Sequence, residues 1–214
     1  YEHENIIRID VDNSKQPNSR WYSGSGIYRD VNLWTGKDVY ISHDKLRITT
    51  LSVNDDMAVI EVCAQLKNII GHGLEAECLI EIKKDGQKTA SDTQRVVFRS
   101  EQMQTVRVQI PIEHPKKWSP KQPALYECHI TTKFDDKICD EAVSNFGIRV
   151  LALDPVHGLQ INGETVKLRG TCIHHDNGVI GAETFKEAEW YRCKRLKEAG
   201  FNAIRSAHHP MSRA

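Results

Sequence analysis

The sequence predicts a mainly β protein: an antiparallel β-sandwich of immunoglobulin-like size, followed by a short βαβ unit. Three observations carry this prediction. Apolar and polar residues alternate through much of residues 37–150, which is the pattern of strands with one buried face. Turn-forming residues separate the alternating stretches. After residue 184 the apolar spacing changes to that of a helix.

The alternation is clearest in three stretches of the predicted sandwich. Their apolar positions are Ile60, Val62, Ala64 and Leu66; then Leu74, Ala76, Cys78, Ile80 and Ile82; then Val106, Val108, Ile110 and Ile112. Successive side chains of a strand point to opposite faces, so each stretch buries one face. Turns are expected at residues 54–56, 71–73, 84–86 and 135–137. The spacing predicts about seven or eight strands, enough for a sandwich.

A βαβ unit is predicted near the end of the chain. Its strands are expected at residues 166–170 and 202–206, and they must run parallel because the helix carries the chain back. Thr184 and Glu187 have the spacing of a capping box at the start of the helix. A buried apolar stripe is expected on this helix, formed by Phe185, Ala188, Tyr191, Leu196 and Ala199. Gly200 is expected in the left-handed conformation that ends a helix, with Phe201 packed back on the last turn.

Both ends of the chain are expected to belong to incomplete domains. One βαβ unit cannot cover both faces of its own sheet, and a complete (β/α)₈ barrel takes about 250 residues. At the other end, residues 5–11 and 27–33 each predict a strand, too few for a domain. The chain begins with Tyr1 and not with methionine. We therefore expect a piece of a longer protein in which only the middle domain is whole.

Composition excludes several classes of function. The 29 Lys and Arg residues balance 29 Asp and Glu residues, so neither nucleic acid nor a membrane is an expected partner. No apolar run approaches the roughly 20 residues that span a bilayer. The six cysteines form no CxxC pair, which argues against a zinc knuckle or a redox motif. Cys63, Cys78 and Cys128 fall within predicted strands and are expected to be buried thiols. The sequence does not distinguish a cytoplasmic from a periplasmic protein. Disulfide bonds therefore stay an alternative for the case that the protein is exported.

Two histidine pairs, His174-His175 and His208-His209, each follow a strand of the predicted βαβ unit. Parallel strands place such residues at one edge of the sheet, where α/β enzymes keep their active sites. One histidine from each pair could line a pocket together with Asp176 and Arg205. Three roles stay open: metal ligation, which lacks HxH or HxxxH spacing, binding of substrate hydroxyls or charge, and a purely structural role.

Acidic residues that could act as a catalytic pair are not evident. Glu183, Glu187 and Glu189 lie within or beside the predicted helix, where solvated charges are expected. No serine stands in a nucleophile elbow, and no glycine-rich phosphate loop follows a strand. The residues offer binding groups without an identifiable acid, base or nucleophile.

Several stretches of the chain resemble glycoside hydrolase family 2, in the order in which that family has them. Residues 18–31 (NSRWYSGSGIYRDV) are similar to the end of its sugar-binding jelly-roll domain. Its immunoglobulin-like domain is matched by Trp-Ser-Pro at 118–120, Pro-Ala-Leu-Tyr at 123–126 and Phe-Gly-Ile-Arg at 146–149. Entry into the family's (β/α)₈ barrel is matched at 159–163 and 168–170, and its signature at 202–210 (NAIRSAHHP). The resemblance is strongest to bacterial β-galactosidases.

The resemblance implies three domain segments: the end of a jelly-roll at 1–36, a whole immunoglobulin-like sandwich at 37–152, and the start of a (β/α)₈ barrel at 153–214. It also implies a retaining β-glycosidase that removes terminal sugars with two glutamates. Both glutamates are expected further along the barrel, so the chain alone is expected to be inactive. A β-glucuronidase, a β-mannosidase, or a non-catalytic sandwich that binds carbohydrate or another subunit stay as alternatives.

The resemblance also assigns candidate substrate-binding residues. His174 and His208 match positions that contact sugar hydroxyls, Arg205 matches the signature arginine at the barrel mouth, and Asp176 lies in the loop after His174. Trp21 matches a loop that the jelly-roll domain sends toward the barrel. The expected partners are a carbohydrate substrate and further copies of the chain in a homo-oligomer. No cofactor is expected in this chain, and a divalent or monovalent cation in the full-length enzyme stays open.

Overall fold

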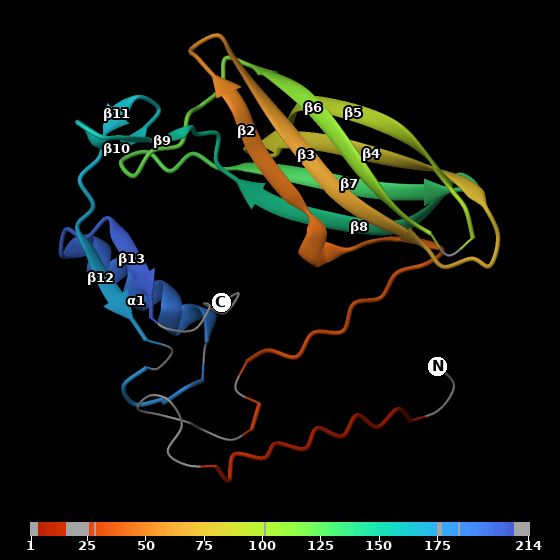
Figure 1. Cartoon of the computed structure of the whole chain (residues 1–214), viewed down its shortest axis with the longest axis horizontal. Helices are drawn as coiled ribbons and strands as arrows, with labels where there is room; N and C mark the ends of the chain where they lie inside the picture. Colours follow the sequence, from red (N-terminus) through yellow and green to blue (C-terminus); the bar gives the residue numbers. More distant parts are fainter. Residues whose placement is uncertain are drawn as a thin grey trace. The chain divides into compact units, whose positions relative to one another are not determined.

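The structure is a computed structural model that describes residues 4–15, 26–27, 29–100, 102–174, 177–183 and 185–207. Its contacts divide the chain into two compact units. One is Leu33–Lys167, and the other combines Tyr1–Asn32 with Leu168–Ala214. The first unit holds the predicted sandwich and the second holds the predicted βαβ unit (Figure 1).

The first sheet of the sandwich is built around its longest strand, β3 (Met57–Asn68). Strand β6 (Met103–Glu113) pairs with β3 along nearly its whole length. The other edge of β3 is shared by β1 (Val39–Ile41) and β2 (Arg47–Val53), which are separated by a short 3₁₀ helix, η1 (His43–Lys45). All of these pairings are antiparallel.

The second sheet has the strand order β5-β4-β7-β8, also antiparallel. Its strands are β4 (Leu74–Lys84), β5 (Gln87–Phe98), β7 (Tyr126–Phe134) and β8 (Lys137–Phe146). Two-residue turns join β4 to β5 at Asp85-Gly86 and β7 to β8 at Asp135-Asp136. All four turn residues have positive φ, as in the type I′ turns that suit the twist of a hairpin. The turns predicted at 84–86 and 135–137 are confirmed.

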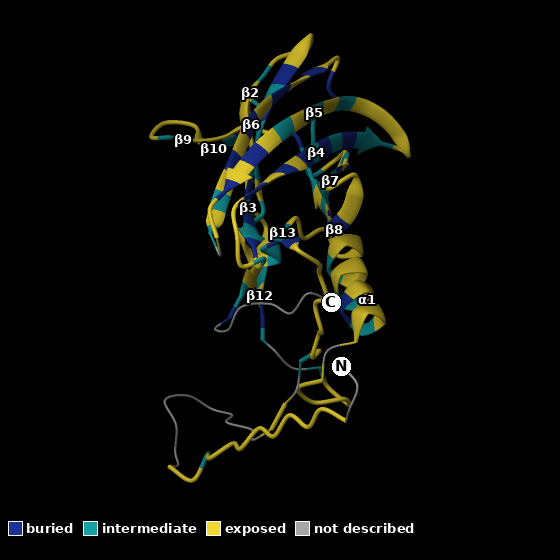
Figure 2. Cartoon of the chain, turned by 90° about the vertical axis from the view of Figure 1, so that its right-hand side faces the viewer, coloured by how far each residue is buried: buried dark blue, intermediate teal, exposed yellow. Residues whose placement is uncertain are grey.

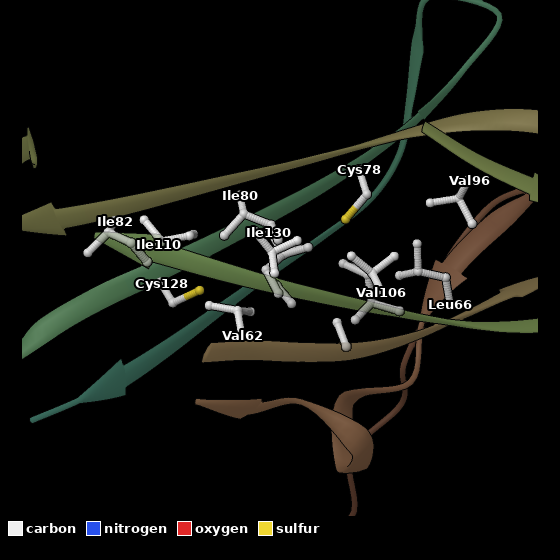
Figure 3. Packing of buried hydrophobic residues seen from close by; sticks show 14 of the residues in the cluster. Val62, Leu66, Cys78, Ile80, Ile82, Val96, Val106, Ile110, Cys128 and Ile130 are labelled. Carbon is white, nitrogen blue, oxygen red and sulfur yellow. The ribbon is translucent and has the colours of Figure 1, made fainter. Parts of the chain in front are cut away.

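The core lies between the two sheets. Every apolar residue of the three alternating stretches named above is buried, and the alternation of buried and exposed positions runs along the strands (Figure 2). Figure 3 shows side chains of both sheets gathered in this layer, among them Val62 and Ile110 from one sheet and Ile80 and Ile130 from the other. Burying a Val, Leu or Ile side chain contributes about 1.5–3 kcal/mol to stability. The alternating pattern therefore favours the arrangement in which the apolar faces of the two sheets pack together. The predicted antiparallel sandwich of about seven or eight strands is confirmed, with β1–β8 as its strands.

The thiols divide according to the face of the strand. Cys78 and Cys128 are buried in the core, as predicted, and Cys139 is buried with them. Cys63 is only half-buried, so its predicted burial is wrong. It lies between the buried positions 62 and 64 of β3 and therefore points away from the core. All six cysteines are free.

A small antiparallel sheet follows the sandwich within the same compact unit. Its order is β11-β10-β9, formed by β9 (Leu151–Asp154), β10 (Gly158–Ile161) and β11 (Glu164–Thr165). The turn between β10 and β11 is Asn162-Gly163, again with positive φ at both residues. The domain boundaries at 36/37 and 152/153 stay predictions.

The second unit contains the predicted βαβ arrangement. Strands β12 (Gly170–Ile173) and β13 (Ala203–Ser206) are parallel neighbours joined through helix α1 (Lys186–Glu198). The first strand was expected at 166–170, and this position is wrong because the strand begins where β13 pairs with it, at Gly170 opposite Ala203. Val166 instead extends the β10–β11 hairpin, since its amide donates to the carbonyl of Leu159, one residue beyond the pair Gln160–Thr165.

The two ends of α1 differ in how well the sequence predicted them. The helix begins at Lys186 with Phe185 as N-cap and without a capping side chain. The predicted N-cap at Thr184 is therefore wrong by one residue, and Thr184 itself lies outside the described residues. The predicted left-handed conformation of Gly200 is confirmed by its φ of +89°. The amides of Gly200 and Phe201 donate to the carbonyls of Lys197 and Leu196, each at 3.0 Å, which is a Schellman motif.

The predicted buried stripe on α1 is wrong. Phe185 and Tyr191 are 52% and 60% exposed, and Ala199 is exposed as well. Only Ala188 and Leu196 are half-buried, and most of the helix surface is exposed in Figure 2. The sheet described in this unit has two strands, which is too narrow to cover a full apolar face of a helix.

The two strands expected near the start of the chain are also wrong. Within residues 4–15, 26–27 and 29–38 the structure contains no strand. Ile6 and Ile7 are 83% and 82% exposed. A strand needs a neighbour to pair its backbone groups, and these segments have none among the described residues. No described helix is long and apolar enough to cross a bilayer.

Candidate functional site

The candidate site lies at the carboxyl ends of β12 and β13. The two strands are paired in register, with Cys172 opposite Arg205 and Ile173 opposite Ser206. The ladder continues for one more bond, because the amide of Ala207 donates to the carbonyl of Ile173 at 3.0 Å. His174 directly follows β12, so it leaves the sheet at the edge where the signature segment leaves β13.

Arg205 is exposed, and it lies beside Cys172 of the neighbouring strand. Its Nη1 donates to the Sγ of Cys172 at 3.6 Å. The exposed Cys172 and Arg205 alternate with Ile173 and Ser206, which are buried and half-buried. The guanidinium of Arg205 is accessible, as is the neighbouring Ile204, and its donors can reach an anion or a hydroxyl.

His174 is half-buried, and a side chain of the helix holds its backbone. Its carbonyl accepts a hydrogen bond from Nη1 of Arg192 at 3.4 Å. Arg192 in turn forms an ion pair through Nη2 with Oε2 of Glu189, one turn earlier on α1. The strand end that carries His174 is thus joined to the helix.

Glu189 is a buried residue of this unit that the sequence did not predict. We expected a solvated helix charge, and this is wrong: Glu189 is 5% exposed and both of its carboxylate oxygens are bonded. Oε1 accepts from Nδ2 of Asn177 at 2.9 Å, while Oε2 faces Arg192. A charged group is buried only when it is paired in this way. Its one local signal is the Glu-x-x-Arg spacing, which is common on exposed helices as well.

The loop after β12 is closed on itself next to this cluster. The backbones of Asn177 and Gly181 exchange two hydrogen bonds, of 2.7 and 2.8 Å. Gly181 has positive φ, which glycine adopts without strain. The closed loop keeps the Asn177 amide in reach of Glu189. The other acidic candidates, Glu183 and Glu187, are exposed as predicted.

Of the five predicted site residues, the structure describes two: His174 directly follows β12, and Arg205 lies in the neighbouring parallel strand β13. His208, Asp176 and Trp21 lie outside the described residues, as do His175 and His209. Within the described part of the chain, no group of three or more His, Cys, Asp or Glu residues is arranged to hold a metal ion.

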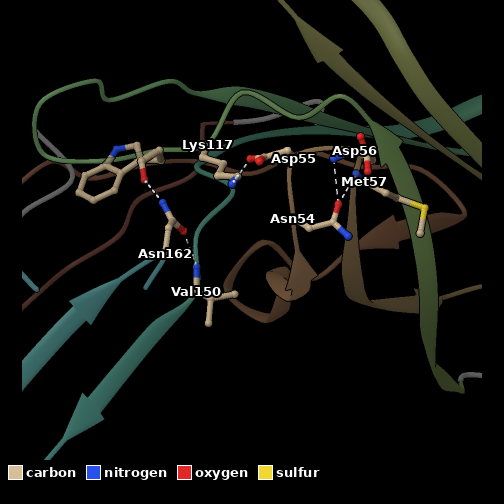
Figure 4. Close-up of polar contacts among 8 residues, drawn as sticks. Asn54, Asp55, Asp56, Met57, Lys117, Val150 and Asn162 are labelled. Carbon is tan, nitrogen blue, oxygen red and sulfur yellow. Dashed lines mark hydrogen bonds and ion pairs between the residues drawn. The ribbon is translucent and has the colours of Figure 1, made fainter. Parts of the chain in front are cut away.

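A separate hollow of about 600 Å³ lies at one end of the sandwich unit. It is lined by residues of β2, of the loop around Trp118, and of the segment 145–151. The guanidinium of Arg149 stands 4.2 Å above the ring of Trp118. Asn162 bonds the Trp118 carbonyl, and nearby Lys117 pairs with Asp55 at 2.6 Å (Figure 4). Arg149 and Trp118 of its lining contact each other, and none of the predicted site residues that the structure describes lines this hollow.

The fold is that of a β-sandwich protein with a parallel βαβ unit, in which a half-buried histidine follows one strand and an exposed arginine lies on the next. The sequence model of the glycosyl hydrolases family 2 matches residues 39–149, more than half of the chain. The chain therefore belongs to glycosyl hydrolase family 2.

Comparisons with individual proteins agree with this assignment. The chain is 31% identical to β-galactosidase BoGH2A of Bacteroides ovatus, over 98% of the chain and 25% of that protein. A crystal structure of a family 2 member from Bacteroides cellulosilyticus superposes with a TM-score of 0.86 at 33% identity, covering 95% of this chain and 28% of that one. Bacteroides uniformis β-glucuronidase superposes with a TM-score of 0.82 at 25% identity, covering 95% and 26%. The chain thus spans about a quarter of the length of these relatives.

Proposed function

We propose that this chain is part of a retaining β-glycosidase, in which it supplies the immunoglobulin-like sandwich and the first strand pair of the sugar-binding catalytic barrel. The observation that carries the proposal is the parallel pair β12–β13, in which Arg205 of the family signature lies on the strand next to the one that leads into His174. Family membership and relatives named β-galactosidase and β-glucuronidase support the reaction class.

The chain contributes binding groups to this reaction and not the reacting carboxylates. Retaining hydrolysis needs two carboxyl groups about 5 Å apart, one as nucleophile and one as acid. The buried carboxylate in the described unit, Glu189, is already bonded to Arg192 and Asn177. The two catalytic glutamates are therefore proposed to lie in the remainder of the barrel, and the chain alone is proposed to be inactive.

Each candidate residue has a role suited to its chemistry. The imidazoles of His174 and His208 can donate to and accept from sugar hydroxyls. Arg205 provides fixed donors that stabilise negative charge developing near the scissile bond. Asp176 is proposed to accept from a hydroxyl, and Trp21 to offer an aromatic face to the sugar ring. We also propose that the protein forms a homo-oligomer.

The substrate is proposed to be a terminal β-galactoside, as for BoGH2A. One observation favours a second candidate, a β-glucuronide. The exposed guanidinium of Arg205 is suited to bidentate contact with a carboxylate, and several relatives are named β-glucuronidases.

The test compares hydrolysis of p-nitrophenyl β-galactoside, β-glucuronide and β-mannoside by the longer protein that contains this chain and by the 214-residue chain alone. We expect turnover of the galactoside by the longer protein and none above a buffer blank by the chain. A longer protein with no β-glycosidase activity contradicts the reaction class. Turnover by the chain contradicts the placement of the glutamates.

Variants of the longer protein test the site. His174→Ala is expected to raise KM for the preferred glycoside by about tenfold, because a buried hydrogen bond to a sugar hydroxyl is lost. His72→Ala is the matched control, since His72 lies in an exposed loop of the sandwich. Equal KM values for the two variants contradict the role of His174.

A further inference from the structure

The carboxylate of Glu189 joins three parts of the second unit. Through Asn177 it bonds the closed loop after β12, at 2.9 Å. Through Arg192 it is linked to the carbonyl of His174, at the end of β12 itself. Since Glu189 and Arg192 belong to α1, the helix is tied to the chain at His174 and again at Asn177.

Burial distinguishes this group from the other charges of α1. Glu189 is the one buried residue of the helix within its described span, whereas Glu198 and Arg195, the other i,i+3 pair of α1, are both exposed. An exposed pair of this kind contributes little. A buried pair is costly to desolvate and is weak evidence for stability, so its best-supported use is to specify one arrangement of the groups around it.

The hydrogen bonds of Arg192 show which group the buried ion pair holds in place. Arg192 uses two different nitrogens, Nη2 for Glu189 and Nη1 for His174. Because the guanidinium is planar and rigid, a carboxylate that holds Nη2 in place also holds Nη1 at the His174 carbonyl. That carbonyl belongs to the residue proposed to contact sugar, so holding it restricts the backbone from which the imidazole projects.

We propose that Glu189 and Arg192 are positioning residues that fix the backbone of His174 and thereby aim its imidazole at the substrate. The effect on substrate binding rests on the proposed function. The coupling of Glu189 and Arg192 to His174 rests only on the hydrogen bonds described above. Glu189 is buried and bonded on both oxygens, which suits a positioning role. Loss of its charge frees Arg192 from the carboxylate and lets the end of β12 adopt other orientations.

The coupling is tested first in the 214-residue chain, by NMR of isotope-labelled histidines. The variant His174→Gln assigns the His174 resonances. Glu189→Gln is expected to shift the His174 backbone and ring signals, and Glu189→Asp to restore part of the shift because it keeps the charge. Glu198→Gln is the matched control from the same helix. Identical His174 signals in Glu189→Gln and Glu198→Gln overturn the proposal.

A second variant separates positioning from folding. Arg192→Lys keeps a cation for Glu189 but lacks the second nitrogen that reaches the His174 carbonyl. It is expected to preserve the methyl signals of the sandwich core and the signals of α1 while shifting those of His174. If the signals of α1 are preserved and those of His174 do not move, the guanidinium bridge does not position His174.

The consequence for binding is tested in the longer protein by a double-mutant cycle. We expect Glu189→Gln to raise KM about fivefold or more with a smaller change in kcat, and Glu198→Gln to leave both unchanged. In the His174→Ala background, Glu189→Gln is expected to have no further effect on KM, because the residue that it positions is gone. Additive effects on KM overturn the proposal. Absence of any β-glycosidase activity contradicts the proposed function instead, and the NMR result then decides the coupling by itself.

Discussion

The side chain of Asn162 bonds two separate points of the sandwich unit. Its Nδ2 donates to the carbonyl of Trp118 at 3.0 Å, and its Oδ1 accepts from the amide of Val150, also at 3.0 Å. The Asn162 backbone amide donates to the Val150 carbonyl at 2.9 Å. One residue in the β10–β11 turn therefore holds the small sheet against the loop at Trp118 (Figure 4).

Replacing Asn162 is expected to destabilise this junction. Asn162→Ala removes two side-chain hydrogen bonds, each of which contributes about 1 kcal/mol to stability. It also places alanine at φ of +54°, a conformation that costs alanine about 1–2 kcal/mol. We expect the free energy of unfolding to fall by about 2–4 kcal/mol, measured by urea denaturation. Asn162→Gly separates the terms, because it loses the bonds without the backbone strain and should cost less. An alanine variant as stable as the wild type contradicts the role of the side chain.

Gly147 is required by the ring of Trp118. A Cβ at position 147 would lie 2.8 Å from the Cβ, Cγ and Cδ1 atoms of Trp118, closer than side chains pack. The Arg149 guanidinium lies over the same ring, so the ring has little freedom to move away. Gly147→Ala is expected to lower the free energy of unfolding by about 1–3 kcal/mol.

Gly71→Ala is the control for this substitution. A Cβ there meets nothing within 4 Å, and Gly71 does not have positive φ. Alanine at such a position is expected to be neutral or to stabilise by up to about 1 kcal/mol, because it restricts the unfolded chain. Equal losses of stability at positions 147 and 71, measured by thermal unfolding, contradict the packing argument.

The β7–β8 turn carries strain that glycine would relieve. Asp135 and Asp136 have φ of +52° and +57°, and aspartate occupies this region at a cost that glycine avoids. Asp136→Gly is expected to raise the free energy of unfolding by about 0.5–1 kcal/mol. The reverse change in the equivalent β4–β5 turn, Gly86→Ala, is expected to lower it by a similar amount or more, since Gly86 has φ of +78°. Changes of the same sign in the two hairpins contradict this interpretation.

The sandwich could be predicted because its signal is local. A buried face imposes period-two alternation on each strand, and turn residues such as Asp85-Gly86 mark the hairpins directly. The extended segment at residues 5–11 has similar composition but no strand. Pairing depends on a neighbouring strand, and the alternation of one segment carries no information about whether that neighbour exists.

The candidate site was predictable only in part for the same reason. That β12 and β13 end at one edge follows from the βαβ connection, which fixes parallel strands, so the placement of His174 and Arg205 on adjacent strands could be derived. Glu189 could not be identified, because its burial depends on Asn177 and Arg192 meeting it from different segments. His208, Asp176 and Trp21 stay predictions.

Two core thiols give the sandwich a distinctive response to alkaline pH. Burial raises the pKa of Cys78 and of Cys128 from 9.0 to about 12. The charges of Asp92 and Glu77 add to the effect at Cys78, and Cys78 itself adds to the effect at Cys128. Between these pH values the unfolded chain loses thiol protons that the folded chain keeps.

Because the unfolded state then binds fewer protons than the folded state, stability must fall as pH rises above 9. Each thiol contributes a slope of about 1.4 kcal/mol per pH unit once its unfolded form is ionised. The free energy of unfolding, measured in urea between pH 8 and 11, is expected to decrease less steeply in the double variant Cys78→Ala/Cys128→Ala. Cys193→Ala is the control, since that thiol is exposed in the folded chain. Equal slopes in the wild type and the double variant contradict ionisation of the core thiols as the cause.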